Sequence, residues 1–268
     1  APALAGPGVF LLAAAGWHGR GLLRRLIERE SPAFLPLAVF FHAATTAALV
    51  AGGTLGLIDG VRYSVRRRLI DAAVVVAYLR SLATPGAGGY LIHFLTHRCN
   101  AACAHCFDHP QRQRIAREDE LGLPRIRKLA ASAGPLGHVS LTGGEPLLRA
   151  DIADIVAAYY DAGARSFSLS SNGSYPERLA GLLPQLSAAA PFARIIITLS
   201  VDGIGERHDR MRGLPGLYEK VEYSLALLCQ ARQWYPQIRV HACITLTQDN
   251  VADLDGIVAR LYTFRLDQ

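Results

Sequence analysis

Short apolar runs alternate with longer amphipathic stretches over the last two thirds of the chain. Runs rich in β-branched and aromatic residues predict strands at 90–97, 138–143, 166–171, 194–201 and 239–246. Stretches with helical spacing separate them, near 120–133, 150–162, 176–189, 216–233 and 251–263. Such strand–helix units favour a parallel sheet with outer helices, either an α/β barrel or a doubly wound sheet. Five units are too few for an eight-unit barrel, so we expect a further strand beyond Gln268.

The first 85 residues predict a helical, partly hydrophobic region. Helices are expected at 21–30 and 61–83, and the uncharged stretch from Ser31 to Ile58 between them is long enough to cross a bilayer. Pro36 and the glycine pair at 52–53 predict interruptions there. Arginines flank the stretch on both sides, whereas a single span carries its positive excess on one side. We therefore favour helices that pack on the core or lie on a membrane surface.

A Gly-rich turn at 83–89 predicts the boundary between this region, residues 1–85, and a core of residues 86–268. The first region holds nine arginines and four acidic residues, which accounts for most of the formal charge of +6. Because the basic character belongs to the helical region, nucleic acid is not an expected partner. The chain begins with Ala1 and ends within a repeating pattern, which indicates a fragment.

Three of the five cysteines, Cys99, Cys103 and Cys106, fall in the stretch HRCNAACAHCFDHP at 97–110 with C-x3-C-x2-C spacing. Three thiolates with an open fourth position suit a catalytic-type zinc site or an iron–sulfur cluster with one free iron. A zinc-organised binding or scaffold protein would complete its shell with His97, His105 or His109. An odd cysteine count without a secretory signal indicates a reducing, cytoplasmic location.

Polar motifs follow the next three predicted strands: GGEP at 143–146, SNG at 171–173 and SVDG at 200–203. The carboxyl ends of parallel strands meet at one edge of a sheet or barrel. We therefore expect the cysteines and these motifs to line one rim.

The cysteine spacing directly after a first strand, with GGEP after the second, resembles the radical S-adenosylmethionine (radical SAM) enzymes over about residues 88–264. The segment SVDGIGERHDRMRG at 200–213 is similar to that of peptide- and sulfatase-maturing members, the SPASM or twitch group. The resemblance implies an α/β fold, a partial six-unit barrel of the TIM type, here truncated after the fifth unit. It also implies a [4Fe-4S] cluster and S-adenosylmethionine, cleaved reductively to a 5'-deoxyadenosyl radical that takes hydrogen from a substrate such as a peptide or protein.

The resemblance makes Cys99, Cys103 and Cys106 the cluster ligands and assigns S-adenosylmethionine contacts to the rim. Gly143 and Gly144 would let the backbone approach the methionine amino group, and Glu145 would hold that group or anchor the loop. Arg212 would clamp the carboxylate, its alternative being a surface salt bridge with Asp209. The other expected cofactor contacts are His105 near adenine, Ser171 and Asn172 near the nucleoside, and Ser200 and Asp202.

For Ser171 and Asn172 a capped left-handed turn before Gly173 is the alternative. Cys229 and Cys243 lack the spacing of a second cluster. The resemblance further implies an electron donor of the flavodoxin or ferredoxin type. Residues 1–85 would give peripheral contact with a membrane, and their apolar stretch leaves a membrane-lipid modifier as an alternative within the same enzyme class.

Overall fold

The computed structural model describes residues 35–85, 87, 89–108 and 120–267, with side chains from residue 56 onward except 57. The chain divides into two compact units, residues 1–65 and 66–268. The described part of the first unit is the beginning of helix α2 (Leu35–Ala83). The predicted helix at 21–30 lies outside the described residues.

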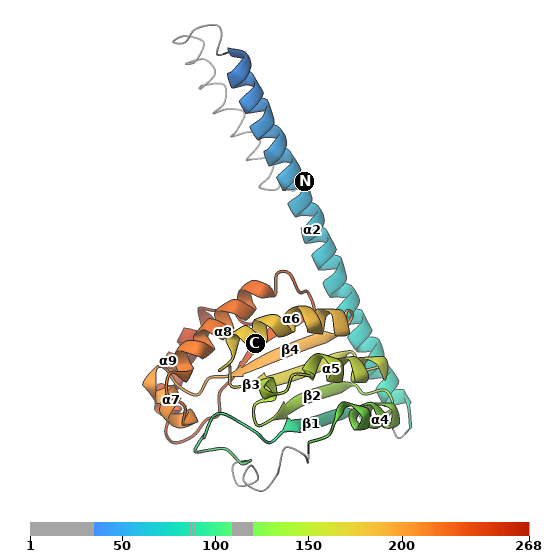
Figure 1. Ribbon diagram of the computed structural model, residues 1–268, viewed down its shortest axis with the longest axis vertical. Coiled ribbons are helices and arrows are strands. Elements are labelled where there is room, and N and C mark those ends of the chain that lie inside the picture. The colour runs from blue at the N-terminus through green and yellow to red at the C-terminus, as the bar shows by residue number, and fades with distance from the viewer. Residues whose placement is uncertain (1–34, 86, 88, 109–119, 268) are drawn as a thin grey trace, which may run out of the picture. The chain divides into compact units, whose positions relative to one another are not determined.

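Five parallel strands form one sheet in the second unit, in the order β1-β2-β3-β4-β5. The strands are β1 (Tyr90–Thr96), β2 (His138–Gly143), β3 (Ser166–Ser171), β4 (Arg194–Ser200) and β5 (Ile238–Cys243). The connecting elements are α4 (Leu123–Ala133), η3 (Pro146–Leu148), α5 (Ile152–Asp161), α6 (Pro176–Ala189), α7 (Glu206–Arg212), α8 (Leu217–Ala231), η4 (Val251–Asp253) and α9 (Leu254–Tyr262). The predicted α/β fold is confirmed as a partial barrel (Figure 1).

Alternation along the strands gives the sheet two different faces. Val139, Phe167, Ile195 and Ile238 pair across four strands and are at most 1% exposed. They belong to the core that the outer helices cover (Figure 1). The other face carries polar side chains at intermediate exposure, among them Ser140, Ser168, Ser170 and Thr198.

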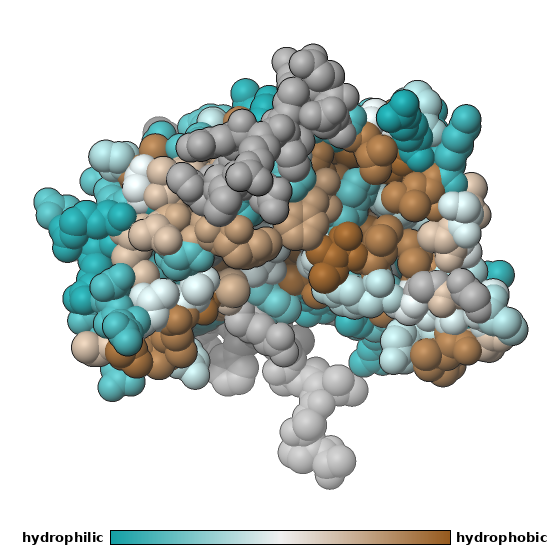
Figure 2. Space-filling view, turned by 90° about the horizontal axis from the view of Figure 1, so that it is seen from below, coloured by the Kyte–Doolittle hydropathy of each residue, from teal (hydrophilic) through white to brown (hydrophobic). Residues whose placement is uncertain are grey.

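On the sheet face opposite the outer helices, side chains of neighbouring strands pair with one another. Ser140 is paired with Ser168, and Ser170 is paired with Thr198. At the β1 edge Tyr90, Ile92 and Phe94 are exposed. Figure 2 looks from below, the side on which β1 lies in Figure 1, and shows hydrophobic side chains in separate groups among hydrophilic ones.

Within the second unit, the end of α2 lies against the amino ends of the strands. Asp71 pairs with Arg194 at 3.0 Å and with Arg239 at 3.5 Å, at the starts of β4 and β5. Ile70, one residue earlier, is 0% exposed. The part of α2 that belongs to the second unit therefore covers the end of the sheet opposite to the predicted rim.

Helix α2 is continuous through the glycine pair at 52–53, so the predicted interruption there is wrong. Pro36 is the second residue of the helix, where its missing N–H leaves no hydrogen bond unmade. Within the part of the chain that the structure describes, no helix is both long and apolar enough to cross a membrane. The stretch expected to lie on or in a membrane, Ser31 to Ile58, falls mostly on residues whose side chains lie outside the described ones.

Candidate functional site

The cysteine loop follows β1 directly and is fastened to the end of α7. Cys103 is buried, whereas Cys99 and Cys106 are half-buried. The backbone N–H of Ala102 donates to the carbonyl of Arg212 at 3.0 Å, and that of Ala104 donates to Met211 at 3.3 Å. Two segments more than a hundred residues apart in sequence thus share a short backbone bridge.

The two glycines of GGEP bring the end of β2 against the same loop. The Gly144 N–H donates to the Thr96 carbonyl at 2.7 Å, and the Glu145 N–H donates to the Arg98 carbonyl at 2.8 Å. A Cβ on Gly143 would lie 2.2 Å from the Thr96 carbonyl oxygen, and one on Gly144 would lie 2.1 Å from that of Arg98. Gly143 also has a φ of +130°. Packing therefore requires both glycines, and their predicted role beside the methionine amino group stays a prediction.

Glu145 is fully buried and joins the ends of β2 and β3. Its carboxylate accepts from the Leu147 N–H at 3.0 Å, the Ser171 hydroxyl at 2.9 Å and the Asn172 N–H at 2.7 Å. Burial raises the pKa of Glu145, and these hydrogen bonds together with the Arg212 charge oppose that shift. Of its two expected roles, these contacts support anchoring the loop.

Ser171 and Asn172 lie in the turn expected as their alternative role. The Gly173 N–H donates to the Ser171 hydroxyl at 3.0 Å, and Gly173 has a φ of +73°. The Asn172 side chain also reaches the cysteine loop, because Nδ2 lies 3.9 Å from Cys99 Sγ and 2.9 Å from Asn100 Oδ1. Asn172 is therefore both a turn residue and a neighbour of a predicted ligand.

Asp202 is the meeting point of two other predicted residues. Its Oδ2 lies 2.7 Å from a terminal nitrogen (Nη2) of Arg212 and 3.2 Å from Nε2 of His105. Its Oδ1 accepts from the Thr245 N–H at 2.8 Å. Arg212 Nη1 donates to Cys103 Sγ at 3.8 Å. The structure thus brings Asp202, Arg212 and His105 together beside the cysteines.

The alternative salt bridge between Arg212 and Asp209 is wrong. Asp209 accepts from the N–H groups of Gly216 at 2.6 Å and Tyr218 at 2.8 Å and so caps the start of α8. Ser200 ends β4 at intermediate exposure, in register with Cys243 on β5. It lies on the rim as expected, and its cofactor contact stays a prediction.

Two residues of the site, Asn100 and Arg149, were not predicted from the sequence. Asn100 donates to the Ser174 hydroxyl at 2.9 Å and so links the cysteine loop to the turn after β3. Arg149, after η3, donates to the Leu95 carbonyl at 2.9 Å and pairs with Asp151 at 2.7 Å. Only the position of Asn100 beside a predicted ligand could have marked it.

The donor set fits a multi-iron cluster. Each of two cysteine sulfurs has a side-chain N–H donor nearby, an arrangement that tunes iron–sulfur centres. Arg212 Nε is buried without a hydrogen-bond partner among the described residues, and Asp202 Oδ2 has only its ion pairs. Among the residues that the structure describes, no three His, Cys, Asp or Glu side chains converge on a single metal-ion position. A cluster binds each thiolate to a different iron, so its ligands do not converge on one point.

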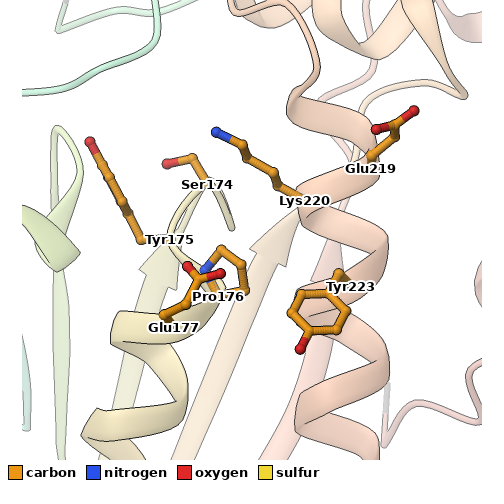
Figure 3. A pocket seen from close by; sticks show the side chains of 7 residues that line it. All are labelled: Ser174, Tyr175, Pro176, Glu177, Glu219, Lys220 and Tyr223. Carbon is orange, nitrogen blue, oxygen red and sulfur yellow. The ribbon is translucent and has the colours of Figure 1, made fainter.

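A surface pocket of about 430 Å³ lies beside this rim, where the starts of α6 and α8 face each other, and Ser174, which accepts from Asn100, is one of its lining residues (Figure 3). Tyr175, Glu177, Lys220 and Tyr223 line it. None of the predicted site residues does, so the pocket is not the candidate site.

The Radical SAM superfamily matches residues 94–261 of the chain, a range that contains every predicted site residue. The chain belongs to the radical SAM superfamily. The family implies a [4Fe-4S] cluster and S-adenosylmethionine as cofactors, and membership decides against the zinc-organised alternative. His109, which that alternative included, lies outside the described residues.

Fe-coproporphyrin III synthase of Methanosarcina barkeri is 30% identical over 168 residues, which cover 61% of this chain and 38% of that protein. Pre-heme d1 synthase of Dinoroseobacter shibae is 31% identical over 171 residues, 61% of this chain and 38% of that protein. GTP 3',8-cyclase of Synechococcus elongatus is 43% identical over 97 residues, 35% and 30% of the two chains. This radical SAM chain thus spans well under half the length of these relatives.

Among solved structures, native anSMEcpe with bound AdoMet and Kp18Cys peptide aligns with a TM-score of 0.51 and 18% identity. The alignment covers 66% of this chain and 49% of that chain. This likeness supports the radical SAM fold alone.

Proposed function

We propose that the chain binds a [4Fe-4S] cluster through Cys99, Cys103 and Cys106 and S-adenosylmethionine along the rim formed by β2, β3 and β4. The observation that carries this proposal is the junction of the cysteine loop with all three motifs that follow these strands. With both cofactors bound, one electron supplied through the reduced cluster breaks the C5'–S bond of S-adenosylmethionine to methionine and a 5'-deoxyadenosyl radical, which takes a hydrogen atom from the substrate.

The chain's own residues hold and orient these groups. Gly143 and Gly144 place their backbone beside the cysteine loop, and the Asn172 amide faces Cys99. Nη1 and Nη2 of Arg212 each have one contact, with Cys103 and Asp202, and each carries a second N–H, while the Nε–H has no hydrogen-bond partner among the described residues. Three of the five N–H groups thus remain for the carboxylate clamp expected of Arg212.

The substrate would lie on the sheet face opposite the outer helices. On this face, near the rim, side chains with hydroxyl groups are partly exposed and offer hydrogen bonds to a polar substrate. These side chains are Ser140, Thr142, Ser168, Ser170 and Thr198. We propose a peptide or protein substrate and a SPASM- or twitch-like branch, supported by the segment at 200–213.

A tetrapyrrole-type cofactor precursor is the second candidate, because two relatives about 30% identical are named as synthases of Fe-coproporphyrin III and pre-heme d1. The two candidate substrates are distinguished by which of them raises the rate of 5'-deoxyadenosine formation above the rate without substrate. Stimulation by peptides encoded beside the gene supports the first, and stimulation by an iron tetrapyrrole from which Fe-coproporphyrin III can be formed, with loss of that tetrapyrrole, supports the second.

The partners follow from the chemistry. A one-electron donor of the flavodoxin or ferredoxin type would supply the reducing electron, and we propose a cytoplasmic location, where thiols stay reduced. Peripheral contact of residues 1–85 with a membrane is supported by exposed Val61, Arg62, Arg68 and Leu69 on α2.

Single replacement of each cysteine tests the proposal. Cys99→Ala, Cys103→Ala and Cys106→Ala should each lose iron and the reductive cleavage of S-adenosylmethionine, measured after anaerobic reconstitution with dithionite as electron source. Cys229→Ala and Cys243→Ala are matched controls, because neither thiol belongs to the cysteine loop: Cys229 is on α8 and Cys243 is the last residue of β5. Iron near the wild-type level in all three loop variants would refute the assignment.

A further inference from the structure

Two opposite charges lie side by side next to the cysteine loop. Asp202 is 0% exposed and Arg212 is 9% exposed, with 2.7 Å between Oδ2 and Nη2. Arg212 reaches Cys103 Sγ through Nη1 at 3.8 Å, and Asp202 reaches His105, the residue before Cys106, at 3.2 Å. The pair therefore contacts the loop at Cys103 and at His105, which lies between the two last cysteines.

The surroundings fix both members of the pair. Asn250 Nδ2 donates to the Asp202 carbonyl at 2.9 Å, and the Asp202 N–H donates to His208 Nδ1 at 3.1 Å. Arg212 is held by its own backbone, whose carbonyl accepts from Ala102 at 3.0 Å. The next residue, Gly213, has a φ of +60°, and a Cβ there would lie 2.6 Å from the Ala102 carbonyl oxygen. These contacts leave little freedom for either charge to move away from the cysteines.

We propose that Asp202 and Arg212 are positioning residues that act as a matched charge pair on the cluster, Arg212 favouring its reduced state and Asp202 opposing that effect. The inference rests on the proposed function, since it needs a cluster at Cys99, Cys103 and Cys106. Asp202 acts through Arg212 and His105, which differs from the direct cofactor contact expected of it from sequence.

The sign of each effect follows from electrostatics. Reduction adds one negative charge to the cluster, so a nearby cation stabilises the reduced state and a nearby anion destabilises it. Both groups are buried, and interactions between buried charges are screened little by salt. Removing Arg212 should therefore lower the midpoint potential, and removing Asp202 should raise it.

The midpoint potential of the reconstituted cluster, followed by electron paramagnetic resonance during anaerobic redox titration, tests the pair. Arg212→Gln should lower, and Asp202→Asn should raise, the ratio of reduced to oxidised cluster at fixed potential by about tenfold, or about 59 mV for one electron. The double variant should lie closer to wild type than either single variant. Arg210→Gln is the matched control, because Arg210 is on the same helix but its side chain is 70% exposed and pairs with Glu206.

Opposite shifts with a silent control support the proposal, whereas unchanged potentials, or shifts of the same sign, overturn it. A variant that loads no iron is judged by thermal unfolding of its apoprotein. Wild-type unfolding then supports a positioning role at the cluster, and an unfolded apoprotein assigns the pair to the fold and overturns the proposal. Failure of the proposed function is distinguishable, because the wild-type protein itself would then take up no cluster.

Discussion

Replacing Gly144 with alanine should dislodge the cysteine loop. The added Cβ would lie 2.1 Å from the Arg98 carbonyl oxygen, 2.6 Å from its carbon and 2.8 Å from the His97 carbonyl oxygen. All three are backbone atoms, so no side chain can rotate away, and the two segments must separate by about 1 Å. The Glu145 to Arg98 hydrogen bond of 2.8 Å would be lost with this movement.

The expected loss is the sum of two effects. Overpacking of a closely packed site costs about 1–3 kcal/mol, and a lost backbone hydrogen bond adds about 1 kcal/mol. Gly144→Ala should therefore lower the free energy of unfolding by about 2–4 kcal/mol. Because the moved segment begins at Arg98, directly before Cys99, the iron content after reconstitution should fall as well.

Urea unfolding of the apoprotein and iron content are the measurements, with Gly181→Ala as the matched control. Gly181 is exposed within helix α6, and a Cβ there meets nothing within 4 Å. Alanine at that site should raise the free energy of unfolding by up to about 1 kcal/mol through its helix propensity. A Gly144→Ala protein with wild-type stability and iron would refute the reasoning that these two segments must touch.

Three further results are expected. Glu145→Gln should lower the free energy of unfolding, measured in urea, by about 2–3 kcal/mol. The new amide NH₂ group would face one of the three N–H and O–H donors that the carboxylate accepts from, and wild-type stability would contradict the anchoring role. Burial lowers the pKa of His208 to about 4, so the unfolded chain alone takes up this proton as pH falls below 6.5. This uptake should contribute about 2 kcal/mol to the loss of apoprotein stability between pH 7 and pH 5, and His208→Asn should remove that contribution. Carbonate washing of membranes should release the protein, and retention would contradict the peripheral contact proposed for residues 1–85.

The sheet was predictable because each strand carries its own signal. The runs at 138–143 and 166–171 are strands with those limits, since alternate side chains pack under the helices. The interruption predicted at the glycine pair 52–53 was wrong because helix formation is cooperative. Each glycine costs about 1 kcal/mol in a helix, and a helix of 49 residues can absorb that cost.

The rim was predictable from topology, but its contacts were not. The position of each motif after a strand was enough to place Glu145, Asn172 and Asp202 at one edge. Helix α7 escaped prediction because seven residues between glycines give too short a repeat. The meeting of Asp202 with His105 depends on that helix, so no local pattern could indicate it.

The bridge between Ala102 and Arg212 also sets an order of events during synthesis. The cysteines leave the ribosome about 110 residues before Arg212, a delay of roughly 5–20 s at ordinary elongation rates. For that interval the three thiols have neither the α7 backbone nor the Asp202 and Arg212 charges beside them. Cluster insertion with these neighbours in place is thus a step for a chain that has been synthesised past α7. A translation product that ends before α7 would display these thiols to oxidants and to passing metal ions.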